Sequence, residues 1–191
     1  YMHNHIRMYV AFMTCNLAGF QWHDPARWMY YHLLDGDWAS NALSWQWVAG
    51  AFSNKKYVAN QNNINTFFES SQQNTFLDVE YEAFENFETP SVLKDTVPFQ
   101  RKTALPESKP LVLDNNKTTL VYNYYNIDPY WHKDEEVQRV FLLEPSFFAE
   151  QPTSQNSLDF ALALTKNIKG IQIYVGSFFN LVKQYDIKNT I

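Results

Sequence analysis

The segment that decides the fold is RWMYYHLLDGDWASNALSWQW, residues 27–47. Its apolar residues recur every three or four positions, as they do in amphipathic helices, until Asp35-Gly36-Asp37 interrupts the pattern. Because aspartate is a favoured N-cap and glycine breaks helices, one helix is expected to end near Leu34 and another to begin after Asp37. The sequence therefore predicts a second helix over residues 38–49.

This second helix presents different side chains on two faces. Asp37, Asn41 and Trp45 are four residues apart and share a face, whereas Trp47 lies about 200° around the helix from Trp45. Five of the six tryptophans fall in this quarter of the chain, at Trp22, Trp28, Trp38, Trp45 and Trp47. Taken alone, these residues favour a packed aromatic core with a capping aspartate.

One more helix is expected upstream, and a cap signal marks the start of the helix that ends near Leu34. A helical pattern is already running at Tyr1 and continues to about Leu17, with Gly19 as its C-terminal signal. Asp24 then predicts an N-cap, with Pro25 at the first helical position. The chain opens without an initiator methionine, so we expect it to be a segment of a longer protein.

The pattern changes class after the aromatic region. Polar tracts that we interpret as loops follow up to residue 74, and four prolines then predict an extended connector. The last part reads as strand, strand, helix and strand, with a right-handed β-α-β crossover, over residues 118–126, 140–143, 157–168 and 170–175. We therefore expect a mainly α part, a connector and a small α/β segment, at residues 1–74, 75–117 and 118–191.

Composition excludes several classes of protein. The net charge of the 191 residues is −5; residues 1–63 contribute +1, so the acidic excess of −6 belongs to residues 64–191. A single cysteine, Cys15, rules out an internal disulfide framework or a four-cysteine metal site and fits a reducing compartment such as the cytoplasm. No run of eighteen apolar residues predicts a membrane span. The histidines do not have metal-site or triad spacing, so we expect no metal.

Residues 27–47, together with residues 2–8 (MHNHIRM), closely resemble the flavin-binding helical domain of the DNA photolyase and cryptochrome family. The shared signature is an acid-Gly-acid, an asparagine four residues on and a Trp-x-Trp pair. The resemblance covers about residues 1–66 and implies an incomplete copy of that helical domain. Residues 51–61 look more like divergent bacterial photolyase-related proteins than like the best-known class I enzymes.

The resemblance implies that FAD is the cofactor and assigns four residues to it. Asp37 is expected to contact FAD, and Asp35 to pair with Arg7 beside the isoalloxazine ring, where the arginine stabilises a reduced, anionic flavin. Asn41 is expected to face flavin N5, which an amide can hydrogen-bond in either protonation state.

Two tryptophans resemble members of the family's electron-transfer chain. Trp45 corresponds to the inner member and Trp22 to the middle one, which pass electrons to photo-oxidised flavin. Trp28 and Trp38 have no such counterpart, and we expect them to pack in the core.

The residues expected to face the substrate distinguish the branches of the family. Where the (6-4) photolyase branch has two histidines four residues apart, this chain has Asn4 and Met8, which match the cyclobutane-dimer branch. His3 and His5 flank Asn4, so a shift of one residue would favour the other branch. Trp47 resembles the indole that packs against the flipped dimer.

The resemblance implies a monomeric, light-driven lyase that repairs cyclobutane pyrimidine dimers, with damaged DNA as partner. Two alternatives remain open: a cryptochrome-like photoreceptor without repair activity, and a flavin-free interaction module. The family's contacts to the flavin phosphates and adenine lie mostly upstream of the matched region. We therefore expect the isolated chain to bind flavin poorly and to be inactive.

Overall fold

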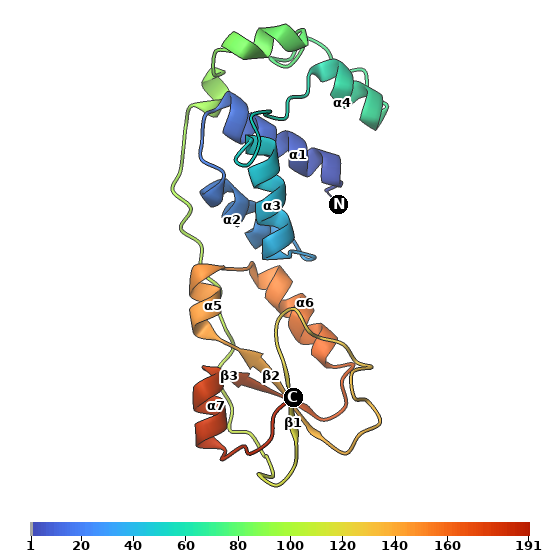
Figure 1. Cartoon of the computed structure of the whole chain (residues 1–191), viewed down its shortest axis with the longest axis vertical. Helices are drawn as coiled ribbons and strands as arrows, with labels where there is room; N and C mark the ends of the chain where they lie inside the picture. Colours follow the sequence, from blue (N-terminus) through green and yellow to red (C-terminus); the bar gives the residue numbers. More distant parts are fainter. Residues whose placement is uncertain (1) are drawn as a thin grey trace. The chain divides into compact units, whose positions relative to one another are not determined.

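The structure, a computed structural model, describes residues 2–191 (Figure 1). Its contacts divide the chain into two compact units. The first unit comprises residues 2–30 and Asp37–Gln100, and the second comprises Tyr31–Gly36 and Arg101–Ile191. The boundaries expected from the sequence, after residues 74 and 117, stay a prediction.

The first unit is helical, as predicted. In chain order it contains α1 (Asn4–Phe12), η1 (Met13–Leu17), most of α2 (His23–His32), α3 (Trp38–Ala49), α4 (Gln61–Phe68), η2 (Tyr81–Asn86) and η3 (Ser91–Leu93). α1 packs against α3, and both bury large apolar side chains, among them Phe12 and Trp45.

The first three helices agree with the sequence in part. The helical run from Asn4 continues to Leu17, although its last turn, η1, is a π-helix, and Gly19 follows with the positive φ of 76° of a helix end. The expectation at Tyr1 lies outside the described residues. The bounds of α3 are as predicted.

The predicted cap of α2 was wrong. α2 begins at His23, so Asp24 lies in its first turn, and the backbone carbonyl of Trp22 accepts the Ala26 N–H at 3.0 Å. The helix also ends at His32 and does not reach Leu34.

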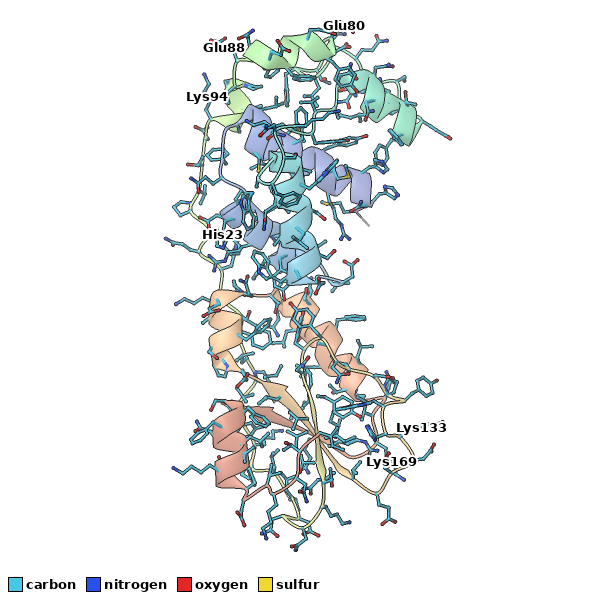
Figure 2. All side chains as sticks on the ribbon, in the orientation of Figure 1. His23, Glu80, Glu88, Lys94, Lys133 and Lys169 are labelled. Atoms are coloured by element: carbon cyan, nitrogen blue, oxygen red, sulfur yellow. The ribbon has the colours of Figure 1, made fainter. Side chains whose placement is uncertain are left out.

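One helix forms where the sequence predicted a loop. α4 lies in the polar tract because the side chain of Asn60 accepts the backbone N–H of Asn63 at 3.0 Å and caps the helix. The rings of Phe67 and Phe68 meet rings of α1, which holds α4 in place. Two acidic side chains flank η2: Glu80 precedes it and Glu88 follows it, and both are exposed (Figure 2).

The proline-containing connector is extended after η3, as expected, and each half belongs to a different unit. In the first unit, the Thr89 hydroxyl donates to the Leu17 carbonyl at 2.8 Å. In the second unit, the Gln172 side chain donates to the Val112 carbonyl and accepts the Val112 N–H, both at 2.8 Å. The amide therefore pairs with the connector as a strand would.

The second unit contains a parallel sheet in the order β1-β2-β3, formed by Thr119–Tyr122, Gln138–Leu143 and Ile171–Val175. Its helices are α5 (Pro145–Glu150), α6 (Gln155–Thr165) and α7 (Phe178–Gln184). α5 and α6 connect β2 to β3, which confirms the short β-α-β unit. Successive β2 residues alternate between two cores, one that includes Leu158 of α6 and one that includes Leu181 of α7.

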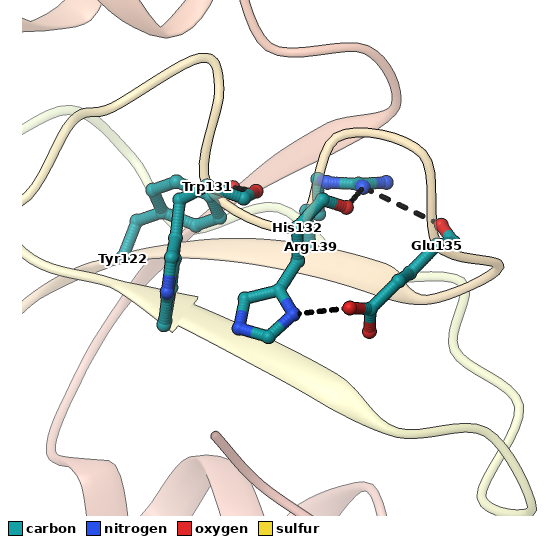
Figure 3. A network of polar contacts seen from close by, with 5 residues as sticks. All are labelled: Tyr122, Trp131, His132, Glu135 and Arg139. Carbon is teal, nitrogen blue, oxygen red and sulfur yellow. Dashed lines mark hydrogen bonds and ion pairs between the residues drawn. The ribbon is translucent and has the colours of Figure 1, made fainter.

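β1 and β2 are parallel strands joined by a loop instead of a helix. The guanidinium of the buried Arg139 holds this loop by donating to the His132 carbonyl at 2.6 Å (Figure 3). It also donates to the Val137 carbonyl at 3.2 Å. The Tyr122 hydroxyl donates to the Trp131 carbonyl at 3.1 Å. These bonds supply side-chain donors to half-buried loop carbonyls and so tie the loop to β1 and β2.

Across residues 2–191, no helix combines the length and the apolar character needed to cross a membrane.

Candidate functional site

The candidate site is built on the N-terminal half of α3. The Asp37 carboxylate caps the helix by accepting the Ser40 N–H at 2.7 Å. Its second oxygen accepts no hydrogen bond from the described residues, and the side chain is exposed. Asp37 is therefore both the cap that the sequence predicted and a carboxylate with a free acceptor.

Asn41 lies one turn further along the same face. Its side-chain amide donates to the backbone carbonyl of Ala26 in α2 at 2.8 Å, and the residue is only 9% exposed. This bond fixes the orientation of the amide and leaves its oxygen without a donor among residues 2–191. α3 thus places two acceptor oxygens one helical turn apart.

The two indoles of the Trp-x-Trp pair occupy different environments, as their spacing predicts. Trp45 is 2% exposed and lies in the core of the first unit. Trp47 is 47% exposed, and its ring meets Tyr57 with the ring centroids 5.5 Å apart. An exposed, flat indole supported by a second ring is suited to stacking against a planar ligand.

Tyr57 and its support are features that sequence reasoning missed. The side chain of Asn16 donates to the carbonyls of both Val48 and Tyr57, at 2.9 and 2.8 Å, and so joins the segment after α3 to η1. Burial raises the pKa of Tyr57 to about 12, so its phenol stays protonated at neutral pH. In the sequence, the polar residue Asn16 between the apolar residues Cys15 and Leu17 was the signal that could have indicated this support.

Two pairs of side chains lie in different surroundings at the N-terminal end of α1. The Asn4 amide contacts the Met8 sulfur at 3.9 Å, so these residues lie on one face, as their spacing predicts. His3 and His5 stack on each other with centroids 5.3 Å apart, and His5 stacks on Phe67 of α4 at 4.4 Å. The histidines thus lie against each other and α4, while Asn4 and Met8 form the contacting pair four residues apart.

The expected pair of Arg7 and Asp35 stays a prediction. Arg7 is half-buried in the first unit, whereas Asp35 lies on the segment Tyr31–Gly36, which the contacts assign to the second unit.

The remaining tryptophans divide between core and surface. Trp22 is half-buried with its ring edge-on to His23, and its role in electron transfer with Trp45 stays a prediction. Trp38 packs edge-on against Tyr30, as expected of a packing residue. The expectation for Trp28 was wrong, because this side chain is 42% exposed.

No cluster of three or more histidine, cysteine, aspartate or glutamate side chains able to hold a metal ion is present among residues 2–191.

Comparison with known proteins agrees with this part of the chain. Residues 1–87 match the family model described as the FAD binding domain of DNA photolyase. Fifty residues are 44% identical to a deoxyribodipyrimidine photo-lyase of Agrobacterium fabrum and 44% identical to one of Streptomyces griseus. Each match covers 26% of this chain, and 10% and 11% of the two relatives respectively, so the chain spans about a tenth of their length. No solved structure is significantly similar to the chain. The family match indicates FAD as the cofactor of residues 1–87.

Proposed function

We propose that the chain supplies part of the FAD site of a light-driven enzyme that repairs cyclobutane pyrimidine dimers in DNA. The observation that carries the proposal is the pair of free acceptor oxygens on Asp37 and Asn41, one turn apart on α3, within the region that matches the photolyase FAD domain. As part of the same proposal, the protein is a monomer of the cytoplasm.

The acceptor pair fits a flavin chemically. FAD offers N–H and hydroxyl donors, and each of the two side chains has one oxygen that meets no donor in the described residues. The bond from Asn41 to the Ala26 carbonyl holds the side-chain amide in one orientation. Its oxygen could then accept a hydrogen bond from a protonated flavin N5 without a change in the orientation of the amide. One oxygen of Asp37 would continue to cap α3 while the second accepts a hydrogen bond from FAD.

When bound and reduced, FAD supplies the light absorption and the electron that splits the dimer. The residues of this chain position and insulate that chemistry. Arg7, for which Asp35 is the expected partner, would place positive charge beside the ring system and favour its anionic, reduced form. Trp45, buried in the core, and Trp22 would donate electrons to the flavin when it is oxidised.

The substrate side is formed by Asn4, Met8 and Trp47. The exposed indole of Trp47 offers a flat apolar wall for a dinucleotide flipped out of the duplex, and Tyr57 supports it from behind. Asn4 and Met8, in contact on one face of α1, add a polar and a polarisable group. Their identities, where the other branch has two histidines, favour the cyclobutane-dimer branch.

The test is a repair assay on the protein expressed from its complete gene, with the flavin chemically reduced. A DNA oligonucleotide that carries one thymine dimer is incubated in blue light and in the dark. We expect light-dependent loss of the dimer, reduced by at least tenfold in a Trp47→Ala variant. Bound flavin without any loss of dimer would favour the photoreceptor alternative, and absence of flavin would favour an interaction module.

A further inference from the structure

A short loop after α3 returns to the end of that helix. Gly50 caps α3 with a φ of 70°, and the Tyr57 N–H donates to the Val48 carbonyl at 3.1 Å. Residues 49–56 therefore form a loop that is closed at its neck by Val48 and Tyr57. Trp47 comes directly before one side of this neck, and the ring of Tyr57 on the other side contacts it.

Asn16 holds both sides of the neck from outside the loop. Its side-chain amide donates to the Val48 carbonyl at 2.9 Å and to the Tyr57 carbonyl at 2.8 Å. The two bonds use the two hydrogens of the amide nitrogen. Asn16 lies in η1, which packs against α3. A single side chain thus clamps the neck to the preceding helix.

The orientation of the Asn16 amide has a cost. Its side-chain oxygen is buried and accepts no hydrogen bond from residues 2–191. A buried acceptor without a donor lowers stability. Turning the amide round would lose both donated bonds and place the oxygen against two carbonyls, so the observed orientation is the better one. The clamp is therefore kept although it leaves one polar atom unsatisfied, which points to a role beyond stability.

The backbone around Asn16 is also irregular. In η1 the Ala18 N–H donates to the Met13 carbonyl, five residues back, at 2.9 Å. Turns of this π type are rare in helices and occur often at functional sites. The π-turn and the unsatisfied oxygen are separate observations, and both lie at Asn16.

The clamp reaches the Trp47 indole through Tyr57. The indole is 47% exposed, and the Tyr57 ring contacts it with an angle of 41° between the ring planes. On its other side, the Tyr57 ring lies edge-on to the fully buried ring of Phe12, with centroids 6.3 Å apart. Ordering an exposed side chain costs binding free energy, so an indole that is already held binds a ligand more tightly.

We propose that Asn16 is a positioning residue. Through the backbone of Tyr57 it holds the Trp47 indole in the orientation that a flipped pyrimidine dimer needs, and it thereby sets how strongly the site prefers damaged to undamaged DNA. This inference rests on the proposed function, which makes Trp47 the wall of the substrate site. All of these residues lie in the first unit.

The test compares Asn16→Leu with Thr89→Val as the matched control. Leucine has a similar size and no donor, whereas Thr89→Val removes a hydroxyl that donates to the Leu17 carbonyl beside Asn16 but not to the neck. In the protein expressed from its complete gene, affinity in the dark is measured for an oligonucleotide with one thymine dimer and for the undamaged oligonucleotide. Fluorine NMR of protein labelled with 5-fluorotryptophan reports on the indole, and Trp47→Phe assigns its resonance.

In Asn16→Leu we expect the ratio of the two affinities to fall about three- to tenfold, the factor that loss of one hydrogen bond provides. The Trp47 resonance should shift or broaden, and the flavin content should stay unchanged. Thr89→Val should show neither effect. Asn16→Leu combined with Trp47→Ala should lose no more preference than Trp47→Ala alone, because the effect passes through the indole.

Tyr57→Leu is a second variant, which removes the supporting ring while both bonds of the clamp, which go to backbone carbonyls, can still form. It should lower the ratio of affinities as Asn16→Leu does, and it tests the same connection if Asn16→Leu does not fold. An unchanged ratio in Tyr57→Leu would contradict the connection from the neck to the indole.

Three results would overturn the inference and leave the proposed function standing. They are an unchanged ratio in Asn16→Leu, an equal loss in Thr89→Val, and a full additional loss when Asn16→Leu is combined with Trp47→Ala. A wild-type protein without preference for the dimer would instead contradict the proposed function. The fluorine resonance then decides the positioning role alone, and an unchanged resonance in Asn16→Leu would overturn it.

Discussion

At the residue scale, the candidate site depends on side chains that combine a structural bond with a free acceptor. Asp37 caps α3 with one oxygen and leaves the other free, and Asn41 binds the Ala26 carbonyl while its oxygen remains available. Because each side chain makes a structural bond, the residue types alone favoured a capped, packed core. The free acceptor oxygens could be identified only from the hydrogen bonds of the structure. Single substitutions can separate the two uses.

Substitutions of Asp37 should separate stability from cofactor binding. Asp37→Ala removes the cap and should lower the free energy of unfolding by about 0.5–2 kcal/mol. Asp37→Asn keeps a capping oxygen and should preserve stability, yet it loses the charge that the proposed flavin contact uses. Chemical denaturation and FAD titration of both variants measure the two effects, and equal flavin affinity in Asp37→Asn and wild type would contradict the contact.

Replacement of Asn41 should be costly because of the backbone carbonyl that it serves. Asn41→Leu removes the side-chain donor that bonds the Ala26 carbonyl in a nearly buried position, which costs about 0.5–1.5 kcal/mol. Urea denaturation measures the loss. Ser44→Ala, which removes an exposed hydroxyl that bonds only within α3, is the control and should change stability by less than about 0.5 kcal/mol.

Tyr57 should titrate late and give stability a pH dependence. Burial raises its pKa to about 12 from the ordinary value of 10, so the folded chain retains a proton that the unfolded chain releases. Its contribution is therefore complete below about pH 10 and is lost as the pH rises towards 12. Tyrosinate absorbance should show one late-titrating phenol fewer in Tyr57→Phe than in the wild-type chain, and an unchanged late-titrating fraction in Tyr57→Phe would contradict this.

At the element scale, the sequence was most accurate where a helix boundary is set locally. The bounds of α3 were predicted because an aspartate cap and an Asp-Gly break are local signals. α4 was missed because its asparagines favour turns by propensity. The helix is held by a cap from Asn60 and also by ring contacts to α1, and those ring contacts are not local. The start of α2 lies two residues earlier than predicted, because the Trp22 carbonyl already accepts the Ala26 N–H and so begins the helix before Asp24.

The Gln172 side chain forms hydrogen bonds with the connector, and no pattern in the sequence predicted them. Both hydrogen bonds go to Val112, so Gln172→Ala should free this segment and expose residues 110–114 to protease. Limited proteolysis followed by mass spectrometry detects the new cut. Gln155→Ala, which removes an exposed amide that bonds Asp159 within α6, is the matched control and should leave the pattern unchanged.

At the scale of the whole molecule, the chain joins a helical unit that matches a known FAD domain to an α/β unit beyond that match. The secondary-structure class of both units followed from hydrophobic periodicity, which reports local structure. The assignment of Tyr31–Gly36 to the second unit did not follow from periodicity. It depends on contacts between residues more than a hundred positions apart, such as Leu33 and Ser157.

The flavin content of the protein expressed from its complete gene tests the proposed FAD site most directly. The protein is purified, denatured and assayed for released FAD, beside the Asp37→Ala and Asn41→Leu variants and the Ser44→Ala control. We predict one FAD per wild-type or Ser44→Ala protein and strongly reduced FAD in the other two variants. Wild-type protein without FAD, or FAD unchanged in both variants, would contradict the assignment of the site to this face of α3.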